Sequence, residues 1–93
     1  MQVSEAEFQI IKESLGKWFD DFSVFGSRAR GDAGKFSDLD LCYKVEIPKS
    51  EIIQIKTRFE ESNLPYTVDI VNYNTCSESF QKKIDSEMQG LVK

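Results

Sequence analysis

The chain has 93 residues, 40% of them hydrophobic and 12% aromatic, which is enough for one small domain with a core and too short for two. Its net charge of −4 argues against nonspecific binding to a nucleic-acid backbone, which needs clustered Lys and Arg. Neither a membrane-length apolar run nor an N-terminal signal pattern occurs, so we expect a single cytoplasmic domain spanning residues 1–93, without a membrane or a stable nucleic-acid partner.

The chain begins with the pattern of an amphipathic helix. Ser4 is a suitable N-cap, and Glu7 three residues later completes a capping box. Apolar residues then recur at helical spacing, namely Phe8, Ile11, Leu15 and Trp18. The pattern predicts a helix that continues to about Phe19, before Asp20 and Asp21 interrupt it.

Two strands and a short helix are predicted next. Residues 22–25 are aromatic and β-branched and end at Gly26, which is typical of a strand. Residues 27–33 predict one brief helix, and a loop follows it. Residues 38–45 alternate polar and apolar side chains, which indicates a half-buried strand.

The second half of the chain predicts a helix, a strand and a last helix. Pro48 opens the first of these helices, which ends by Asn63 and Pro65, and residues 66–71 form the strand. The buried face of the helix that Pro48 opens comprises Ile52, Ile55 and Phe59. For the last helix, Thr75 and Glu78 provide a capping-box pattern. Its buried stripe comprises Phe80, Ile84 and Met88, with Leu91 as a further candidate.

The predicted fold is therefore α+β, in the order α-β-α-β-α-β-α, with a small mixed sheet of about three strands flanked by helices. The connection between the first two strands is too short for a crossover helix, which favours an antiparallel pair. The longer helical link to the third strand permits a parallel pair.

The residue types present restrict the chemistry. The chain has no histidine and only two cysteines, Cys42 and Cys76, which lack metal-site spacing. This excludes the usual zinc sites and any triad with an imidazole base. Cys42 lies in an apolar strand pattern, where we expect a buried small hydrophobe. Carboxylates, hydroxyls, backbone amides and cations remain.

Asp38 and Asp40 form the first half of a candidate site. Side chains two residues apart on a strand lie on one face, separated by roughly 6.6 Å at about 3.3 Å rise per residue. Such a pair of carboxylates is suited to Mg²⁺, which takes hard oxygen ligands, or to two cations about 3.5–4 Å apart. Leu39 and Leu41 would face the core and hold the strand rigid.

Gly26 and Ser27 supply the second half. Without a Cβ, Gly26 lets a phosphate approach the backbone, and Ser27 offers a hydroxyl at the start of a helix with free N–H groups. Asp69 is the third candidate, because a charge within the apolar run Val68-Asp69-Ile70-Val71 is costly unless it is paired or metal-bound. There it could serve as the base for in-line displacement at phosphorus.

Each of these features also has a structural interpretation. Alternating aspartates on a strand are more often a solvated face than a metal site, and a lone Gly-Ser turn is common. Asp69 could be an edge residue of its strand. The tripeptide Arg30-Gly31-Asp32 resembles an integrin-type adhesion motif, but a short helix is a poor context for it. Together, the turn and the three carboxylates describe a two-metal phosphoryl-transfer site.

Gly26-Ser27, ten further residues, and Asp38-Leu39-Asp40 resemble the signature of the DNA polymerase beta-like nucleotidyltransferase superfamily. The longer match, Gly26 to Gly31 followed by Ser37 to Leu41, is similar to the minimal nucleotidyltransferase (MNT) domains of prokaryotes. The resemblance implies that Gly26 and Ser27 hold the β- and γ-phosphates of ATP. It implies Mg²⁺ binding by Asp38 and Asp40, with Asp69 as a third metal ligand and base.

The resemblance also implies a biological role. Family members of this size accompany a HEPN-domain toxin as its antitoxin in a hetero-oligomer, and the MNT protein can transfer AMP from ATP to a tyrosine of the toxin. Arg28 and Arg30 match arginine positions of the motif and are candidate contacts to nucleotide or partner; surface ion pairs with Asp32 or other acids are the alternative. With the chain ending at Lys93, we expect no additional acceptor-binding domain.

Two other functions stay open at this stage. The first is a non-catalytic antitoxin, a binding module that neutralises its partner by contact. The second is transfer of a nucleotide, AMP or another NMP, to a small molecule.

Overall fold

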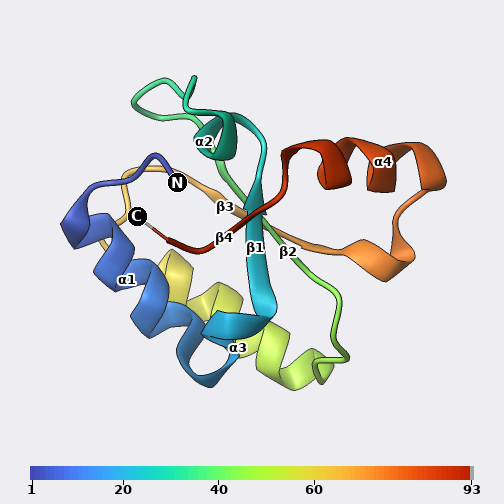
Figure 1. The fold of residues 1–93 in the computed structure, drawn as a ribbon. Coiled ribbons are helices and arrows are strands. Elements are labelled where there is room, and N and C mark those ends of the chain that lie inside the picture. The colour runs from blue at the N-terminus through green and yellow to red at the C-terminus, as the bar shows by residue number, and fades with distance from the viewer. Residues whose placement is uncertain (93) are drawn as a thin grey trace.

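A four-stranded mixed sheet forms the centre of the structure, a computed structural model that describes residues 1–92 (Figure 1). Lys93, the last residue of the predicted domain, lies outside the described residues. The strands are β1 (Phe22–Phe25), β2 (Leu39–Tyr43), β3 (Val68–Asn72) and β4 (Gln89–Gly90). The helices are α1 (Glu5–Leu15), α2 (Ser27–Arg30), α3 (Lys49–Glu60) and α4 (Glu78–Glu87), with the 3₁₀ turns η1 (Gly16–Asp21) and η2 (Tyr73–Thr75).

The sheet has the strand order β3-β2-β1-β4. β1 and β2 are antiparallel, as their short connection predicts, and β2 and β3 are parallel. The predicted α+β class is thus confirmed, but the sheet has four strands rather than about three. The additional strand, β4, is only two residues long and pairs antiparallel with β1, so it has no sequence periodicity of its own.

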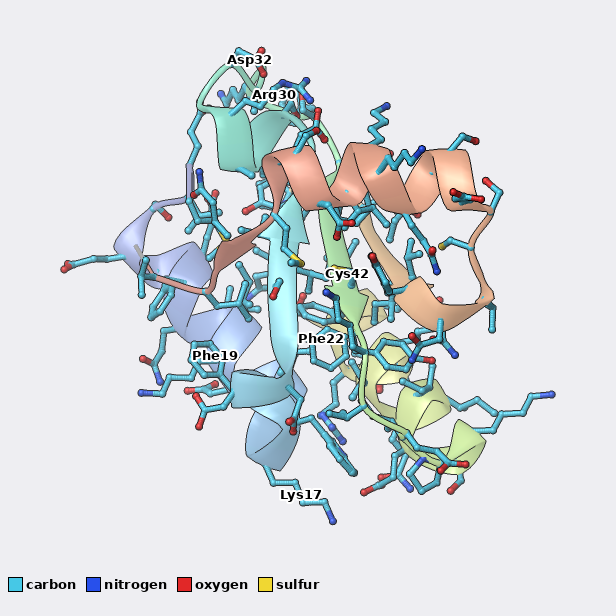
Figure 2. The ribbon with its side chains drawn as sticks, turned by 45° about the vertical axis from the view of Figure 1, so that its right-hand side comes forward. Lys17, Phe19, Phe22, Arg30, Asp32 and Cys42 are labelled. Carbon is cyan, nitrogen blue, oxygen red and sulfur yellow. The ribbon has the colours of Figure 1, made fainter. Side chains whose placement is uncertain are left out.

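Strand alternation divides the buried side chains between two faces of the sheet. On one face, Leu39 and Leu41 are fully buried in a core with Ile11 of α1 and Ile55 of α3. On the other, a smaller cluster packs beneath α4 and comprises Phe25, Cys42 and Ile84. Cys42 is buried, as predicted, and Figure 2 labels it at the central sheet. α4 therefore covers the sheet face opposite α1 and α3 (Figure 1).

Several predicted boundaries are corrected. The capping box of α1 is present, but the helix ends at Leu15, because Gly16 adopts a φ of 56° and a 3₁₀ turn follows. α4 is capped by Ser77 rather than Thr75, which lies in η2. Leu91 lies beyond β4 and packs in the core with α1 and α3, not under α4.

No helix among residues 1–92 combines the length and the apolar character needed to cross a membrane.

Candidate active site

The turn after β1 lies directly against a carboxylate of β2. Gly26 is buried and adopts a φ of 77°, and a Cβ placed on it would collide with Oδ2 of Asp40. Only glycine combines this backbone conformation with so close an approach. Ser27 follows as the first residue of α2. The structure thus brings the Gly-Ser turn and Asp40 into contact.

The strand register brings Asp40 and Asp69 together. Asp40 pairs with Phe25 of β1 on one side and with Asp69 of β3 on the other. Its neighbours Leu39 and Leu41 are fully buried on the opposite face, so Asp40 points toward the α4 side. Asp69 is exposed on the edge strand β3. Asp69 is therefore an edge residue, as the structural interpretation of the sequence proposed. It also lies beside Asp40, as the candidate site requires.

The three carboxylates crowd one another electrostatically. Burial raises the pKa of Asp40 above its ordinary value, and the negative charges of Asp69 and Asp38 raise it further. Asp38 is exposed and lies one residue before β2, close enough for its charge to act on Asp40. The positive charge of Lys83 on α4 opposes this effect. The site therefore carries an excess of negative charge around a half-buried carboxylate.

The carboxylates are not assembled into a ready-made metal centre. Within the described residues, no three carboxylate or thiol side chains stand close enough to hold a metal ion by themselves. The donor set nevertheless fits Mg²⁺, since all three groups offer hard oxygen ligands and their mutual repulsion is relieved by a cation. Mg²⁺ commonly uses one or two protein carboxylates and takes its remaining ligands from substrate phosphates and water.

A groove of about 890 Å³ opens over Asp40 and Asp69, whereas Asp38 and Ser27 are not among the residues that line it. Gly26, Asp40 and Asp69 line it from the sheet, Lys56 lines it from α3, and Lys83 lines it from α4. Its walls combine apolar and polar side chains. The groove therefore provides a space with carboxylates on the sheet and two cations on the flanking helices.

Lys83 and Glu87 are site residues that the motif did not reveal. Glu87 accepts a hydrogen bond from the Gly26 N–H at 3.2 Å, and its second oxygen pairs with Nη1 of Arg30 at 2.6 Å. With Phe80, they lie at i, i+3 and i+7 on α4, and all three line the groove. This spacing puts them on one helix face. The sequence contains this spacing, so it could have shown that the three side chains share a helix face. The spacing alone does not show which part of the fold that face covers.

The two arginines of the motif occupy different environments. Arg30 is exposed and pairs with Asp32 at 3.2 Å as well as with Glu87, so the surface ion pair considered as an alternative is present for it (Figure 2). Arg28 is buried, and its guanidinium donates to backbone carbonyls. A surface ion pair with Asp32 is therefore the wrong description of Arg28, because its charge lies inside the protein.

The chain is similar to known proteins in sequence and in fold. The family model "Polymerase beta, Nucleotidyltransferase" matches residues 20–93. A protein of Haemophilus influenzae described as "Probable protein adenylyltransferase MntA" is 38% identical over 88 residues, which cover 90% of this chain and 77% of the relative.

Solved structures with the same fold are also found. A toxin–antitoxin crystal structure with AMP-PNP matches with a TM-score of 0.66 at 16% identity, covering 97% of this chain and 73% of that one. A structure of a mutant of the toxin–antitoxin MntA-HpeT matches with a TM-score of 0.59 at 15% identity, covering 95% of this chain and 71% of that one. At these identities the similarity establishes the fold alone.

Proposed function

The chain belongs to the polymerase beta nucleotidyltransferase family, and from this premise we propose that it transfers AMP from ATP to a hydroxyl group of a partner protein. One observation carries the proposal: the buried Gly26 turn touches Asp40, which is paired in register with Asp69. A phosphate-binding turn beside clustered carboxylates is the arrangement that phosphoryl transfer requires.

In this proposal the turn and the groove hold the donor nucleotide. The Ser27 hydroxyl and the Gly26 turn hold the β- and γ-phosphates, with the Asp40 carboxylate lying against the turn in the space that a side chain would fill. Lys83 lines the groove, its charge acts on Asp40, and it supplies a further contact to phosphate oxygens. Arg30, exposed beside the turn, remains a candidate contact to nucleotide or partner.

Asp38, Asp40 and Asp69 would hold Mg²⁺, in one or two ions. When bound, Mg²⁺ neutralises the phosphate charge and stabilises the charge that develops on the phosphoryl oxygens. Asp40 is fixed by the buried strand β2, Asp38 lies one residue before that strand, and Asp69 lies at the exposed edge. Asp38 and Asp40 suit the donor side of the site, and Asp69 suits the side from which an acceptor arrives.

The transfer is an in-line displacement at the α-phosphorus. The acceptor hydroxyl oxygen forms a bond to that phosphorus while the bond to the bridging oxygen of pyrophosphate breaks. Asp69 accepts the hydroxyl proton, and pyrophosphate leaves with the bonding electron pair. Because Asp69 is exposed on an edge strand, a side chain of another protein can reach it.

We propose a HEPN-type toxin as the acceptor, modified on a tyrosine within a hetero-oligomer in the cytoplasm. Two findings support this assignment. The MntA relative is described as a protein adenylyltransferase, and the structural neighbours are toxin–antitoxin complexes. We propose ATP as the donor because the same relative is described as an adenylyltransferase.

Co-expression in cells tests the proposal. The toxin from the neighbouring reading frame is expressed with the wild-type chain or with the Asp38→Asn/Asp40→Asn variant, and growth and the intact mass of the toxin are measured. We expect growth and a toxin heavier by AMP with the wild type, and neither with the variant. Growth with the folded variant and an unmodified toxin would instead support neutralisation by contact.

A small-molecule acceptor gives a different pattern. In that case, the purified chain alone would consume ATP with a hydroxylated small molecule, and the toxin would keep its original mass.

A further inference from the structure

Arg28, the second residue of α2, is a buried cation with only 4% of its surface exposed. Its guanidinium nitrogens donate to backbone carbonyls. Nη1 donates to Gln2 at 2.9 Å, while Nη2 donates to Ser37 at 2.9 Å and to Lys35 at 3.2 Å. Nε donates to Ser37 as well, at 3.1 Å. A buried charge is costly without such partners, and here the carbonyls satisfy it.

An aromatic ring fixes the guanidinium from one side. Cζ of Arg28 lies 3.6 Å from the centroid of the Tyr66 ring, a cation–π contact at close range. Tyr66 is itself buried, and its hydroxyl donates to Oε1 of Glu7 at 3.1 Å. Glu7 also completes the capping box of α1. The guanidinium is therefore attached to a rigid part of the fold.

The position of Arg28 in the chain connects the two halves of the motif. It directly follows Ser27, the hydroxyl of the turn. It also holds the carbonyl of Ser37, and Asp38 is the next residue. Between them, residues 31–37 form most of the loop that leads from α2 to β2, and Asp38 is its last residue. One buried side chain thus links the phosphate-binding turn to the segment that carries the exposed carboxylate Asp38.

We propose that Arg28 is a positioning residue that holds the 31–37 loop closed and presents Asp38 to the site, without touching the nucleotide itself. The part that concerns Asp38 rests on the proposed nucleotidyl transfer. A lysine at this position could reach fewer carbonyls, because an ammonium lacks the planar fork of Arg. The arginine is therefore required for its geometry as well as for its charge.

The loop contains amides that report on whether it is closed. The Ala33 N–H donates to Oε1 of Gln2 at 3.0 Å, and the Gln2 side chain returns a bond to the Ala33 carbonyl at 3.0 Å. The Gly34 N–H donates to Oγ of Ser37 at 2.8 Å. If Arg28 holds the loop, these amides lose protection from exchange when it is replaced.

Amide hydrogen exchange followed by NMR tests this on the full chain, without nucleotide or metal. In Arg28→Met we expect the amides of Ala33 and Gly34 to exchange about tenfold faster or more, with the amides of α1 and α3 unchanged. Arg28→Lys should give an intermediate rate. Arg58→Met is the matched control, because the Arg58 guanidinium also donates to a backbone carbonyl, that of Ser14, remote from the loop.

Kinetics separate positioning from direct nucleotide contact. For a positioning residue, Arg28→Lys should raise the Mg²⁺ concentration for half-maximal transfer by about tenfold, with the KM for ATP at saturating Mg²⁺ changed by less than about threefold. A residue that binds nucleotide directly would raise the KM for ATP and leave the Mg²⁺ dependence unchanged. That second result would overturn the proposal.

The hydrogen-exchange result can be interpreted whether or not the chain transfers nucleotides. If the wild type transfers no nucleotide, the proposed function fails, and loop exchange still decides whether Arg28 holds the loop. If Arg28→Met does not fold, Arg28→Lys carries the test. Wild-type exchange at Ala33 and Gly34 in the folded variant would overturn the positioning role.

Discussion

The backbone of Gly26 lies against the Asp40 carboxylate so closely that no side chain fits between them. This contact joins the turn after β1 to the central strand β2. It fixes the carboxylate at the mouth of the turn, where the phosphates of a nucleotide would lie. The activity of the chain should therefore depend on a glycine at position 26, because even the methyl side chain of alanine would collide with Asp40.

Replacing Gly26 with alanine tests that dependence. The added Cβ must displace Asp40, and a displacement of about 1 Å in a catalytic group costs on the order of a hundredfold in rate. The positive φ also destabilises the variant by about 1–3 kcal/mol. Transfer rates and denaturant unfolding measure the two effects.

Gly31→Ala is the matched control. Gly31 has a φ of 86° and open space where its Cβ would lie, so the variant carries backbone strain without a collision. It should lose stability but keep most of its activity. Equal activities of the two variants would show that the contact with Asp40 is irrelevant.

Asp40→Asn should stabilise the protein at neutral pH in the presence of EDTA. Burial and the charges of Asp69 and Asp38 raise the folded-state pKa of Asp40 above its ordinary value of 3.8. Because the folded state binds this proton more tightly than the unfolded state, the carboxyl destabilises the fold as pH rises above that value. The neutral amide avoids the penalty.

Thermal unfolding across pH measures this effect. We expect a Tm a few degrees above the wild type at pH 7, and a difference that shrinks as pH falls toward 3.8. Asp20→Asn, an exposed aspartate outside the site, should show no such gain. A lower Tm for Asp40→Asn at neutral pH would contradict the electrostatic account of the site.

Lys83→Met should weaken ATP binding. If Lys83 contacts the phosphates, losing one charge-assisted hydrogen bond, worth about 1.5–3 kcal/mol, should raise the Kd by about tenfold or more. Lys82→Met is the control, since Lys82 is also exposed on α4 but pairs with Glu78 at 3.8 Å. Calorimetric titration with ATP and Mg²⁺ gives both affinities, and equal values would remove Lys83 from the site.

The sequence predicted those parts of the structure that depend on local patterns. Alternation of Asp38 to Leu41 indicated which face of β2 is buried, and the short link to β1 indicated an antiparallel pair. Placing Asp69 beside Asp40 needed only the inference that β2 and β3 are parallel neighbours, which the register confirms. In each case, the residue pattern of one strand and the length of its connection were enough to predict its buried face or its neighbour.

Other parts depend on tertiary packing that no local pattern reveals. An arginine in a polar motif is expected at the surface, and the burial of Arg28 follows from a loop and a ring far apart in sequence. Glu87 reaches Gly26 because α4 packs against β1, with Ile84 beside Phe25. The strand β4 forms because Gln89 and Gly90 lie beside β1, not from their own propensity.

The most direct test uses ATP labelled at either the α- or the γ-phosphate, with the purified chain, its toxin partner and Mg²⁺. We expect α-label to appear on the toxin and γ-label to leave with pyrophosphate. Asp69→Asn should lower labelling by about a hundredfold or more, as expected for removal of a metal ligand and base. Transfer of γ-label to the toxin would show that the chain does not transfer AMP, and undiminished labelling by folded Asp69→Asn would show that Asp69 is not the base.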